Sequence, residues 1–351
     1  MAQVDERRRL YVDRSVGETR GVVTLRGRPE RLLIARDGET PGPAPGETWA
    51  ARIRRIDPAL GMAFLDMGEG PDAVLPAVAV KGFSQGAAVQ VEVGAGARAD
   101  KGPVVRLLGP AEGEAPARLT GAASLEERLH AYAPRASVTR GPDARELCDE
   151  AEEEALATVF PLPDGGTLSV EAARGMIACD VDVGARAGGD AKRVARAANL
   201  AAVAELARVL RLKGLGGLIA VDLAGRSHDA EAIIRATREA FHADNPGVQV
   251  GGISRLGLLE ISKPWRDRPV AERLRDDKGR LSAATVALRL ARALEREGRV
   301  HGGARLQARC APEVADAFAP LAPGLIERLG ARFSVAGDLA FERARFDVTA
   351  S

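Results

Sequence analysis

The sequence predicts a mixed α/β protein that contains several domains. Its 351 residues exceed the ~100–200 residues of one ordinary domain. The N-terminal third consists of short apolar runs broken by Gly, Pro and Asp turns, a pattern typical of strands. Residues 167–261 instead alternate strand patterns with helical ones, which favours an α/β layer with at least one parallel strand pair.

Two small β units are expected first along the chain. Residues 9–36 hold the runs LYV, GVVTL and RLLIA between turns, and they predict a small antiparallel sheet. The segment PGPAPG, residues 41–46, cannot continue a strand and predicts a linker. Residues 47–108 contain the strand patterns WAARIRRI, GMAFLDMG and AVQVEVG, separated by turns. This rhythm is expected of a small closed barrel, and an OB-fold is the simplest interpretation.

Helical patterns follow a Pro/Gly-rich connector at residues 109–118. Residues 124–156 carry helix formers and the acidic run DARELCDEAEEEAL, which we expect to be a solvated helix face. In the α/β layer, one Ala/Leu-rich helix is expected near residues 190–213, with Gly214 as its stop.

A second helix of that layer is expected at about residues 228–243, with Ser227 as its N-cap. Beyond Lys263 the segment SAATVALRLARALEREG predicts one long amphipathic helix. A compact strand-helix-strand tail ends the chain.

Composition limits the class of protein. Basic and acidic residues nearly cancel, 50 against 49, so any nucleic-acid surface must be local. Most basic residues are arginine, which suits bidentate phosphate contacts, although a codon bias towards Ala, Arg and Gly explains the same composition more simply. The N-terminus is charged where a signal peptide is apolar, and no stretch approaches the ~18 apolar residues of a membrane span. We therefore expect a cytoplasmic protein with no membrane partner.

The cysteines and histidines predict no zinc site. The cysteines are odd in number and far apart, so they offer neither a disulfide framework nor a Cys-x-x-Cys site. The histidines are scattered, with no His-x-x-x-His spacing. These residues are Cys148, Cys179, Cys310, His130, His228, His242 and His301.

Aspartates mark two successive strands of the α/β layer. In the strand pattern GMIACDVDV, Asp180 and Asp182 are two apart and so point to the same face, opposite to Cys179 and Val181. Asp222 ends the next strand pattern, GGLIAVD, after one helix. A right-handed crossover would place the carboxyl ends of both strands side by side, where α/β sheets bind ligands. We therefore expect two or three carboxylates to converge.

Convergent carboxylates repel one another and resist desolvation, so such an arrangement usually holds a hard cation. Mg²⁺ is the natural candidate, with Mn²⁺ as the alternative, because it prefers oxygen ligands and is bound by one or two carboxylates plus substrate phosphate. From spacing alone another interpretation stays open and is the commoner one, namely that each aspartate caps a strand end or turn.

A run of basic residues lies beside these acids. Residues 184–214 hold seven basic residues against two acidic ones, Asp190 and Glu205. A basic surplus beside an acidic metal site suits a polyanion whose backbone must approach the metal, whereas the helix alone is more simply a solvated basic helix. The basic residues are Arg186, Lys192, Arg193, Arg196, Arg208, Arg211 and Lys213, and we expect Arg186, Lys192 and Arg193 to contact RNA.

Three collinear segments resemble the catalytic domain of the ribonuclease E/G family: LSVEAARGMIACDVDVGARAGGD, NLAAVAELARVLRLKGLGGLIAVDLAG and GISRLGLLEIS. The resemblance runs almost continuously through residues 160–262. Weaker similarity covers RIRRIDPALGMAFLDMGEG, which is similar to the family's RNA-binding OB-fold domain, and residues 307–338, which are similar to its small C-terminal domain.

The resemblance implies an α+β multidomain architecture. Its parts would be a ribonuclease-H-like subdomain split between residues 1–40 and 118–166, an inserted OB-fold at 46–109, a deoxyribonuclease-I-like catalytic α/β domain at 167–264, and a small α/β domain at 281–351. It also implies an endoribonuclease that uses Mg²⁺ to hydrolyse phosphodiester bonds in single-stranded RNA during RNA processing or decay, leaving a 5′-phosphate and a 3′-hydroxyl.

By the same resemblance, Asp180 and Asp222 are the two metal-binding aspartates, and Arg255 lies beside the scissile phosphate. Asp182 stands where the family usually has asparagine, which orients a water. Phe64 and Lys101 would lie on the RNA-facing side of the OB-fold. Few aromatics there can stack on bases, Phe64 and Phe83 among them, while Val74 replaces a second phenylalanine, so weak, salt-sensitive RNA binding is the hypothesis.

The sequence departs from the family in two larger respects. Only about twenty residues separate Leu108 from the acidic helical region, which leaves no counterpart of the family's 5′-end sensor. The family's Cys-Pro-x-Cys zinc link is also absent, so any homo-oligomer would not be linked by zinc. Two alternatives to the endoribonuclease remain: a catalytically weak or inactive RNA-binding protein of the same fold, and a metal-dependent phosphatase or nucleotide hydrolase.

Overall fold

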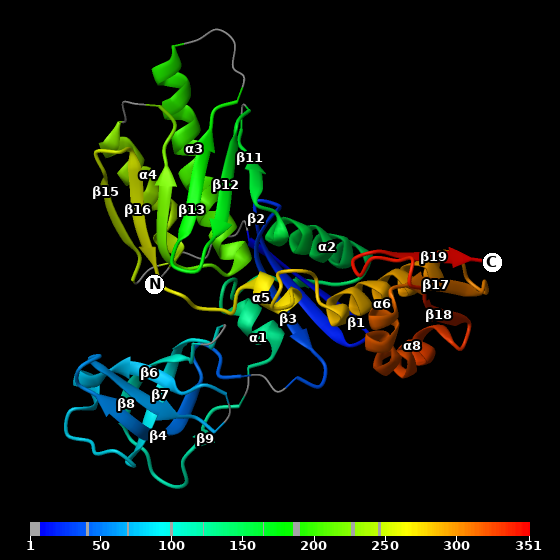
Figure 1. Ribbon diagram of the computed structural model, residues 1–351, viewed down its shortest axis with the longest axis horizontal. Helices are drawn as coiled ribbons and strands as arrows, with labels where there is room; N and C mark the ends of the chain where they lie inside the picture. Colours follow the sequence, from blue (N-terminus) through cyan, green and yellow to red (C-terminus); the bar gives the residue numbers. More distant parts are fainter. Residues whose placement is uncertain are drawn as a thin grey trace.

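The computed structural model describes residues 8–39, 42–68, 70–98, 101–121, 123–163, 165–184, 190–225, 229–244 and 247–351. The chain has the mixed α/β fold that the strand and helix patterns predict, and these residues form four separate sheets (Figure 1). Among the described helices, none has the length and apolar character needed to span a membrane.

The first sheet has the order β10-β1-β2-β3. Strands β1, β2 and β3 are antiparallel neighbours, as predicted for residues 9–36, and β10 adds a parallel edge strand from much later in the chain. Helices α1 and α2 pack against this sheet through two apolar clusters. The elements are β1 (Arg8–Ser15), β2 (Glu18–Leu25), β3 (Arg28–Arg36), α1 (Leu125–His130), β10 (Val138–Thr139) and α2 (Pro142–Leu156).

The second unit, here called the barrel, is a closed sheet. Its strands follow the order β5-β6-β8-β7-β4-β9, and an additional β4–β5 pairing closes the ring. The sequence patterns indicated only three of these strands. Valines, alanines and leucines alternate inward to fill the interior. The elements are β4 (Thr48–Asp57), β5 (Met62–Asp66), β6 (Ala73–Pro76), η1 (Ala77–Val80), β7 (Ala88–Ala95), β8 (Val104–Pro110) and β9 (Ala117–Arg118).

The third unit, here called the central sheet, has the order β11-β12-β13-β14-β16-β15. Strands β13 and β14 form the expected parallel pair, and the other pairs are antiparallel. Helix α3 ends at Gly214, whose φ of 68° is the left-handed conformation that glycine adopts easily. The elements are β11 (Val159–Pro161), β12 (Thr167–Ala172), β13 (Ile177–Asp182), α3 (Ala191–Lys213), β14 (Gly217–Asp222), α4 (Ala230–Ala240), η2 (His242–Asp244), β15 (Gln249–Ile253) and β16 (Leu258–Lys263).

Helices α3 and α4 cover one face of the central sheet and bury a large aliphatic core with it. The residues that point to the other face are exposed or half-buried, so this face is open. The prediction of Ser227 as the N-cap of α4 is wrong. The cap is Asp229, whose carboxylate accepts the Ala232 N–H at 3.2 Å.

The C-terminal unit is a three-stranded sheet with the order β18-β17-β19. The long helix predicted after Lys263 is α6, and its apolar face packs on this sheet together with α7 and α8. The elements are α5 (Val270–Leu274), α6 (Ala283–Val300), β17 (Leu306–Cys310), α7 (Pro312–Phe318), η3 (Ala319–Leu321), α8 (Ala322–Leu329), β18 (Phe333–Gly337) and β19 (Phe346–Ala350).

A buried ionic network joins the first sheet, α2 and α6. Glu152 of α2 is 2% exposed and accepts hydrogen bonds from Arg20 at 3.0 Å, Arg289 at 2.7 Å and Arg292 at 3.1 Å. Arg292 also reaches Glu18 at 2.7 Å. The prediction that the acidic run is a solvated helix face is therefore wrong for this carboxylate, because arginines from distant parts of the chain surround it.

The barrel lies at the foot of the central sheet. The Gly96 N–H donates to the carbonyl of Arg266 at 2.9 Å, and the Arg98 guanidinium lies 4.3 Å from the ring centre of Trp265. Both partners follow β16, whose C-terminal end lies beside the N-terminal end of β14. The carboxyl ends of β13 and β14 are at the opposite end of the sheet (Figure 1).

Candidate functional site

Asp180 and Asp222 are direct neighbours across the parallel strand pair. The register of β13 and β14 aligns Asp180 with Asp222. Neighbouring strands lie about 4.8 Å apart, so two side chains that leave the same face at this register can reach a common ligand. The structure thus brings together the two carboxylates that the sequence predicts to converge.

Both carboxylates point to the open face of the central sheet. Along β13, Ile177, Cys179 and Val181 are buried while Asp180 and Asp182 are exposed, which is the alternation predicted from the sequence. Asp222 is likewise exposed at the end of β14. The aligned positions on the flanking strands are Ser169 of β12 and Leu258 of β16, so a short row of open-face residues crosses four strands.

The surroundings of Asp180 in this row disfavour its negatively charged form. Partial desolvation by the sheet and the negative charges of Asp222 and Asp182 raise the pKa of Asp180 above its ordinary value. No arginine or lysine among the described residues forms an ion pair with Asp180 or Asp222. A cation bound between them would relieve this repulsion.

Asp182 differs from its two neighbours because it also organises the backbone. Its Oδ1 accepts the Gly184 N–H at 2.8 Å, so it forms a turn where the chain leaves β13. Within the described ranges, no group of three or more His, Cys, Asp or Glu side chains is arranged to hold a metal ion. Asp180 and Asp222 therefore constitute a two-carboxylate set, to which water and substrate oxygens would have to be added.

Arg255 lies at the same edge of the sheet. It is exposed in the turn between β15 and β16, and the Ser254 Oγ accepts the N–H groups of Leu256 at 3.3 Å and Leu258 at 3.2 Å to hold this turn. Since Leu258 is aligned with Asp222, the turn that carries Arg255 adjoins the carboxylates. The structure therefore places Arg255 at the same edge of the sheet as Asp180 and Asp222.

The predicted basic surplus on α3 is only partly a surface. Arg208, Arg211 and Lys213 are buried in the half of the helix away from the carboxylates. Arg208 pairs with Glu205, Arg211 pairs with Asp244 at 2.8 Å, and the Lys213 ammonium donates to the Ala155 carbonyl at 2.8 Å. These three residues stabilise the packing of α3, so counting them as part of an anion-binding patch is wrong.

The remaining basic residues lie near the start of α3. Lys192 and Arg193 are exposed in its first turn, and this turn follows the strand that carries Asp180. Arg196 pairs with Asp229, the N-cap of α4, at 2.9 Å. Arg186 lies outside the described residues. Two of the three basic residues predicted to contact RNA are thus solvent-accessible cations on the segment that follows β13.

Asn199 is a polar residue of this region that the sequence patterns did not indicate. It is 1% exposed on α3, its side-chain amide donates to the Ala224 carbonyl at 3.0 Å, and its Oδ1 accepts the Ala224 N–H at 2.9 Å. Ala224 is two residues beyond Asp222. Asn199 therefore fixes the backbone that leaves β14, and its only sequence signal is an amide on an otherwise apolar helix face.

Phe64 and Lys101 lie on the barrel. The strand register aligns Arg55 with Phe64, Phe64 with Val74, and Val74 with Val104 across four strands. The Arg55 guanidinium lies 4.3 Å from the centre of the Phe64 ring. Lys101 is exposed three residues before Val104. This row, here called the barrel row, has a cation at one end and apolar side chains along the rest.

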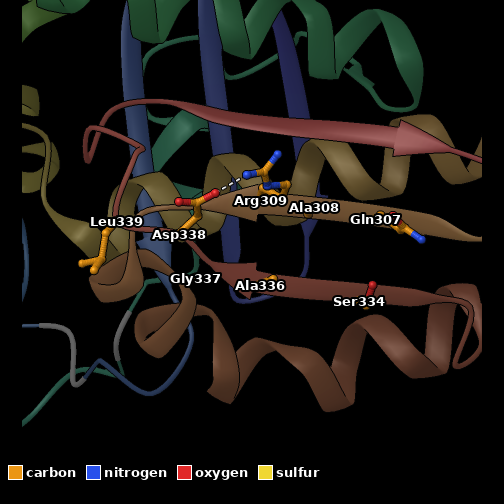
Figure 2. Close-up of a pocket in the computed structure, with 8 residues that line it drawn as sticks. All are labelled: Gln307, Ala308, Arg309, Ser334, Ala336, Gly337, Asp338 and Leu339. Carbon is orange, nitrogen blue, oxygen red and sulfur yellow. Dashed lines mark hydrogen bonds and ion pairs between the residues drawn. The ribbon is translucent and has the colours of Figure 1, made fainter.

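A further cavity of about 500 Å³ lies in the C-terminal unit, far from both features along the chain. It is lined by residues of β17 and β18, with an ion pair between Arg309 and Asp338 at one end and Leu339 beside it (Figure 2). None of the described residues that were predicted to act on RNA lines this cavity.

Comparison with known proteins indicates what the central sheet resembles. Residues 123–266 match the model of the Ribonuclease E/G family. The predicted resemblance to this family is confirmed. The matched residues include α1, α2, every strand of the central sheet, and the residues Asp180, Asp222 and Arg255.

Individual relatives agree with this match. The chain is 38% identical to "Ribonuclease E" of Escherichia coli over 115 residues, which are 32% of this chain and 11% of that protein. It is 32% identical to "Ribonuclease E/G-like protein, chloroplastic" of Arabidopsis thaliana over 126 residues, 34% of this chain and 12% of the other. It is 28% identical to "Ribonuclease G" of Escherichia coli over 114 residues, which are 32% of this chain and 23% of that protein. The chain thus matches well under a third of the length of these relatives.

Proposed function

We propose that this protein is a ribonuclease E/G-type endoribonuclease that hydrolyses phosphodiester bonds in single-stranded RNA with Mg²⁺. The observation that carries the proposal is the alignment of Asp180 with Asp222 on the open face of the central sheet, next to the turn that bears Arg255. The similarity to ribonucleases E and G over this part of the chain supports the same activity.

The residues present fit a hard divalent cation. Two carboxylates without ion-pair partners among the described residues leave the same face at aligned positions, and desolvation together with the negative charge of Asp222 raises the pKa of Asp180. A bound Mg²⁺, or Mn²⁺ in its place, would supply Lewis-acid chemistry at the phosphate and lower the pKa of water. Asp180 and Asp222 would hold it, and no zinc is expected to take part.

The other side chains of the edge would act on the substrate directly. The Arg255 guanidinium can donate two N–H groups to phosphate oxygens and so stabilise the negative charge that develops during hydrolysis. Asp182 uses one oxygen for the Gly184 N–H, and its second oxygen is left to accept a hydrogen bond from the attacking water. Attack on phosphorus with departure of the 3′ oxygen would leave a 5′-phosphate and a 3′-hydroxyl.

The proposed division of the chain follows from the sheets. The order of the barrel strands, with β6 and β8 parallel and the ring closed by β4 and β5, supports an OB-fold at residues 46–109. The first sheet draws on chain before and after the barrel, which supports a split ribonuclease-H-like subdomain at 1–40 and 118–166. We assign the deoxyribonuclease-I-like catalytic domain to 167–264 and the small domain to 281–351.

We propose that the barrel row binds RNA, through Phe64 as a stacking platform and Lys101 as a phosphate contact. Lys192, Arg193 and Arg186 would bind phosphates near the carboxylates. The barrel lies at the opposite end of the central sheet from the carboxyl ends of β13 and β14, where Asp180 and Asp222 stand (Figure 1). The two sites would therefore contact different parts of a long RNA strand, or different copies of the chain in a homo-oligomer.

One observation favours the alternative of an RNA-binding protein with weak or no activity. Asp182 places a third negative charge beside Asp180 and contributes to its raised pKa. This charge would tighten cation binding at neutral pH, but it also changes the group that faces the water. The experiment below separates the two functions.

The test is cleavage of a labelled single-stranded RNA with Mg²⁺ or with a chelator, using the wild type, Asp180→Asn, Asp222→Asn and the control Glu171→Gln. Glu171 is an exposed carboxylate of β12 on the same open face, aligned with Ala178 rather than with an aspartate. The proposal predicts Mg²⁺-dependent cutting that either aspartate substitution abolishes and Glu171→Gln preserves. RNA that is bound but never cut would support the alternative.

A further inference from the structure

Two adjoining cavities separate the barrel from α1 and the segment after β16. Their volumes are about 710 and 480 Å³. Pro45, Arg128, Arg266 and Asp267 line both, so the cavities form one continuous depression, here called the junction cleft. It lies at the foot of the central sheet and shares no residue with the Asp180 and Asp222 site.

The junction cleft is rich in arginine. Seven arginines but only four acidic residues line it. Two of those acids are paired with arginines outside the cleft: Glu92 forms an ion pair with Arg106, and Glu47 lies 3.5 Å from Arg118. The acids that bind cleft arginines include Asp267, which accepts a hydrogen bond from Arg128 at 3.0 Å. Three of the arginines are likewise paired with acids outside the cleft, Arg8 with Glu30, Arg31 with Asp244 and Arg36 with Glu18. Arg273 pairs with Glu39 inside it. Among the described residues, the positive surplus of the cleft therefore rests on Arg266 and Arg268.

Arg266 is the cleft cation with the most unused capacity. Its carbonyl accepts the Gly96 N–H at 2.9 Å, so its backbone is fixed against the barrel. Its side chain is exposed, and it forms no ion pair or hydrogen bond with any residue in the described part of the chain. Arg268, two residues later, is exposed too, and its guanidinium donates to the Glu272 carbonyl at 3.1 Å but forms no ion pair with the described residues.

The cleft continues the barrel row. Val104, at the end of that row, is aligned with Ala95 of β7. The residues on either side of Ala95 line the cleft, Gly94 in the smaller cavity and Gly96 in the larger one. A strand lying along Phe64, Val74 and Val104 would therefore enter the cleft as it leaves the barrel. Gly94 is exposed at this entrance.

We propose that the junction cleft binds phosphate groups of an RNA strand, with Arg266 as the main contact and Arg268 as the second. The planar guanidinium suits this role because it can present two N–H groups to one phosphate. The choice of RNA rests on the proposed function, whereas the choice of phosphate rests on the charges of the cleft. The cleft would hold a segment of RNA away from the carboxylates and add to the affinity of the barrel row.

The test measures RNA binding without cleavage. Fluorescence anisotropy of the full chain in a chelator would compare the wild type, Arg266→Gln, the double variant Arg266→Gln/Arg268→Gln and the control Arg345→Gln. Arg345 is an exposed arginine of the C-terminal unit, distant from the cleft, so it matches the loss of charge. Single-stranded oligoribonucleotides with a 5′-hydroxyl or a 5′-monophosphate distinguish internal phosphodiesters from a terminal phosphate. Circular dichroism checks that each variant is folded.

The expected result is roughly tenfold weaker binding for Arg266→Gln, because one charge-assisted hydrogen bond is lost. The slope of log affinity against log salt should fall by about 0.7 for each phosphate contact removed, and Arg345→Gln should change neither quantity. If affinity falls for both oligonucleotides, the cleft binds internal phosphodiesters. If it falls only for the oligonucleotide with a 5′-monophosphate, the cleft binds the terminal phosphate.

Binding by Arg266→Gln and by the double variant that equals the wild type overturns the proposal. If that result comes with cleavage that depends on Asp180, the proposed function stands and only the cleft assignment fails. If the wild type neither binds nor cuts RNA, the proposed function fails first.

Discussion

The same residue types play opposite roles in two regions of this protein. In the network around α2, burial alone would raise the pKa of Glu152, but Arg292, Arg289 and Arg20 outweigh burial and hold that pKa below its ordinary value. At the edge of the central sheet, desolvation and neighbouring acids raise the pKa of Asp180. One region supplies every buried carboxylate with arginines, and the other gathers carboxylates that pair with no arginine among the residues the structure describes.

This difference distinguishes charged side chains that stabilise the fold from charged side chains that are available to a ligand. Ion pairs that are buried and multiply bonded stabilise the contact between the first sheet and α6, and removing one partner leaves the others uncompensated. Carboxylates left to repel one another on an exposed sheet face weaken the fold unless a cation joins them. The charged residues of the chain are nearly balanced, so only their placement makes this distinction.

The largest expected effect is on cleavage, in Asp180→Asn. Loss of one of two cation ligands removes several kcal/mol of transition-state stabilisation, so the cleavage rate should fall by about a thousandfold or more. The melting temperature without metal should stay the same or rise, because a repulsive charge is gone. Single-turnover cleavage and thermal melting measure the two quantities. A variant that loses activity by unfolding would contradict the assigned role.

The next effect is on stability, in Glu152→Ala. The buried Arg20, Arg289 and Arg292 would lose a shared partner, which should cost about 3 kcal/mol or more. Urea unfolding measures the loss of stability, and RNA cleavage is assayed at urea concentrations well below the unfolding midpoint. Retained cleavage per folded molecule is expected, and an unchanged unfolding midpoint would show that the network is not structural.

The pH dependence of stability should also differ between the two regions. The folded-state pKa of Glu152 is lowered, so its stabilisation is present above the unfolded-state pKa and is lost as pH falls through the folded-state value. The folded-state pKa of Asp180 is raised, so protonation of Asp180 relieves repulsion as pH falls. The free energy of unfolding should therefore fall less steeply with decreasing pH in Glu152→Gln than in the wild type. In Asp180→Asn the dependence on pH should be close to that of the wild type. The reverse order would contradict the comparison.

Asn199→Ala tests positioning rather than chemistry. Leaving both half-buried Ala224 backbone groups without their partner should cost about 1 kcal/mol of stability. It should also lower kcat for cleavage more than it changes KM, because the backbone after Asp222 is no longer fixed. Asn199→Asp keeps the acceptor for the Ala224 N–H and should recover part of kcat. Equal kcat values in all three proteins would assign Asn199 to packing alone.

The smallest effect is expected from Asp182→Asn. Removing this charge takes away one of the causes that raise the pKa of Asp180, so the acidic limb of the pH profile for cleavage should move to lower pH. The matched control is Glu171→Gln, which removes an equal charge from the same face. A shift of the same size in both variants would mean that the profile reports the general field of the face and not the carboxylate cluster.

The sequence predicts local order better than it predicts burial. The two-residue alternation in β13, the single helix before β14 and the strand end at Asp222 were enough to place Asp180 beside Asp222, since parallel neighbours fix the register. Gly214 marked the end of α3 because its left-handed conformation favours glycine.

Tertiary partners are what the sequence patterns could not supply. The sequence predicted a basic surface at Arg208, Arg211 and Lys213. Most of their acceptors, among them Asp244 and the carbonyl of Ala155, come from other elements and are not apparent from local sequence. Glu152 was predicted to be solvent-exposed for the same reason. The strand at 73–76 is only four residues long, too short for a periodic signal, and Asn199 acts through a backbone group that carries no side-chain signature.

The most direct test of the Asp180 and Asp222 site is the position of a bound metal. Crystals of the full chain soaked in Mn²⁺ would be measured for anomalous scattering, with Asp222→Asn as the control. The account predicts one strong peak about 2.0–2.2 Å from an oxygen of both Asp180 and Asp222, which is lost in the variant. A peak elsewhere, or none at a Mn²⁺ concentration that supports RNA cleavage, would contradict it.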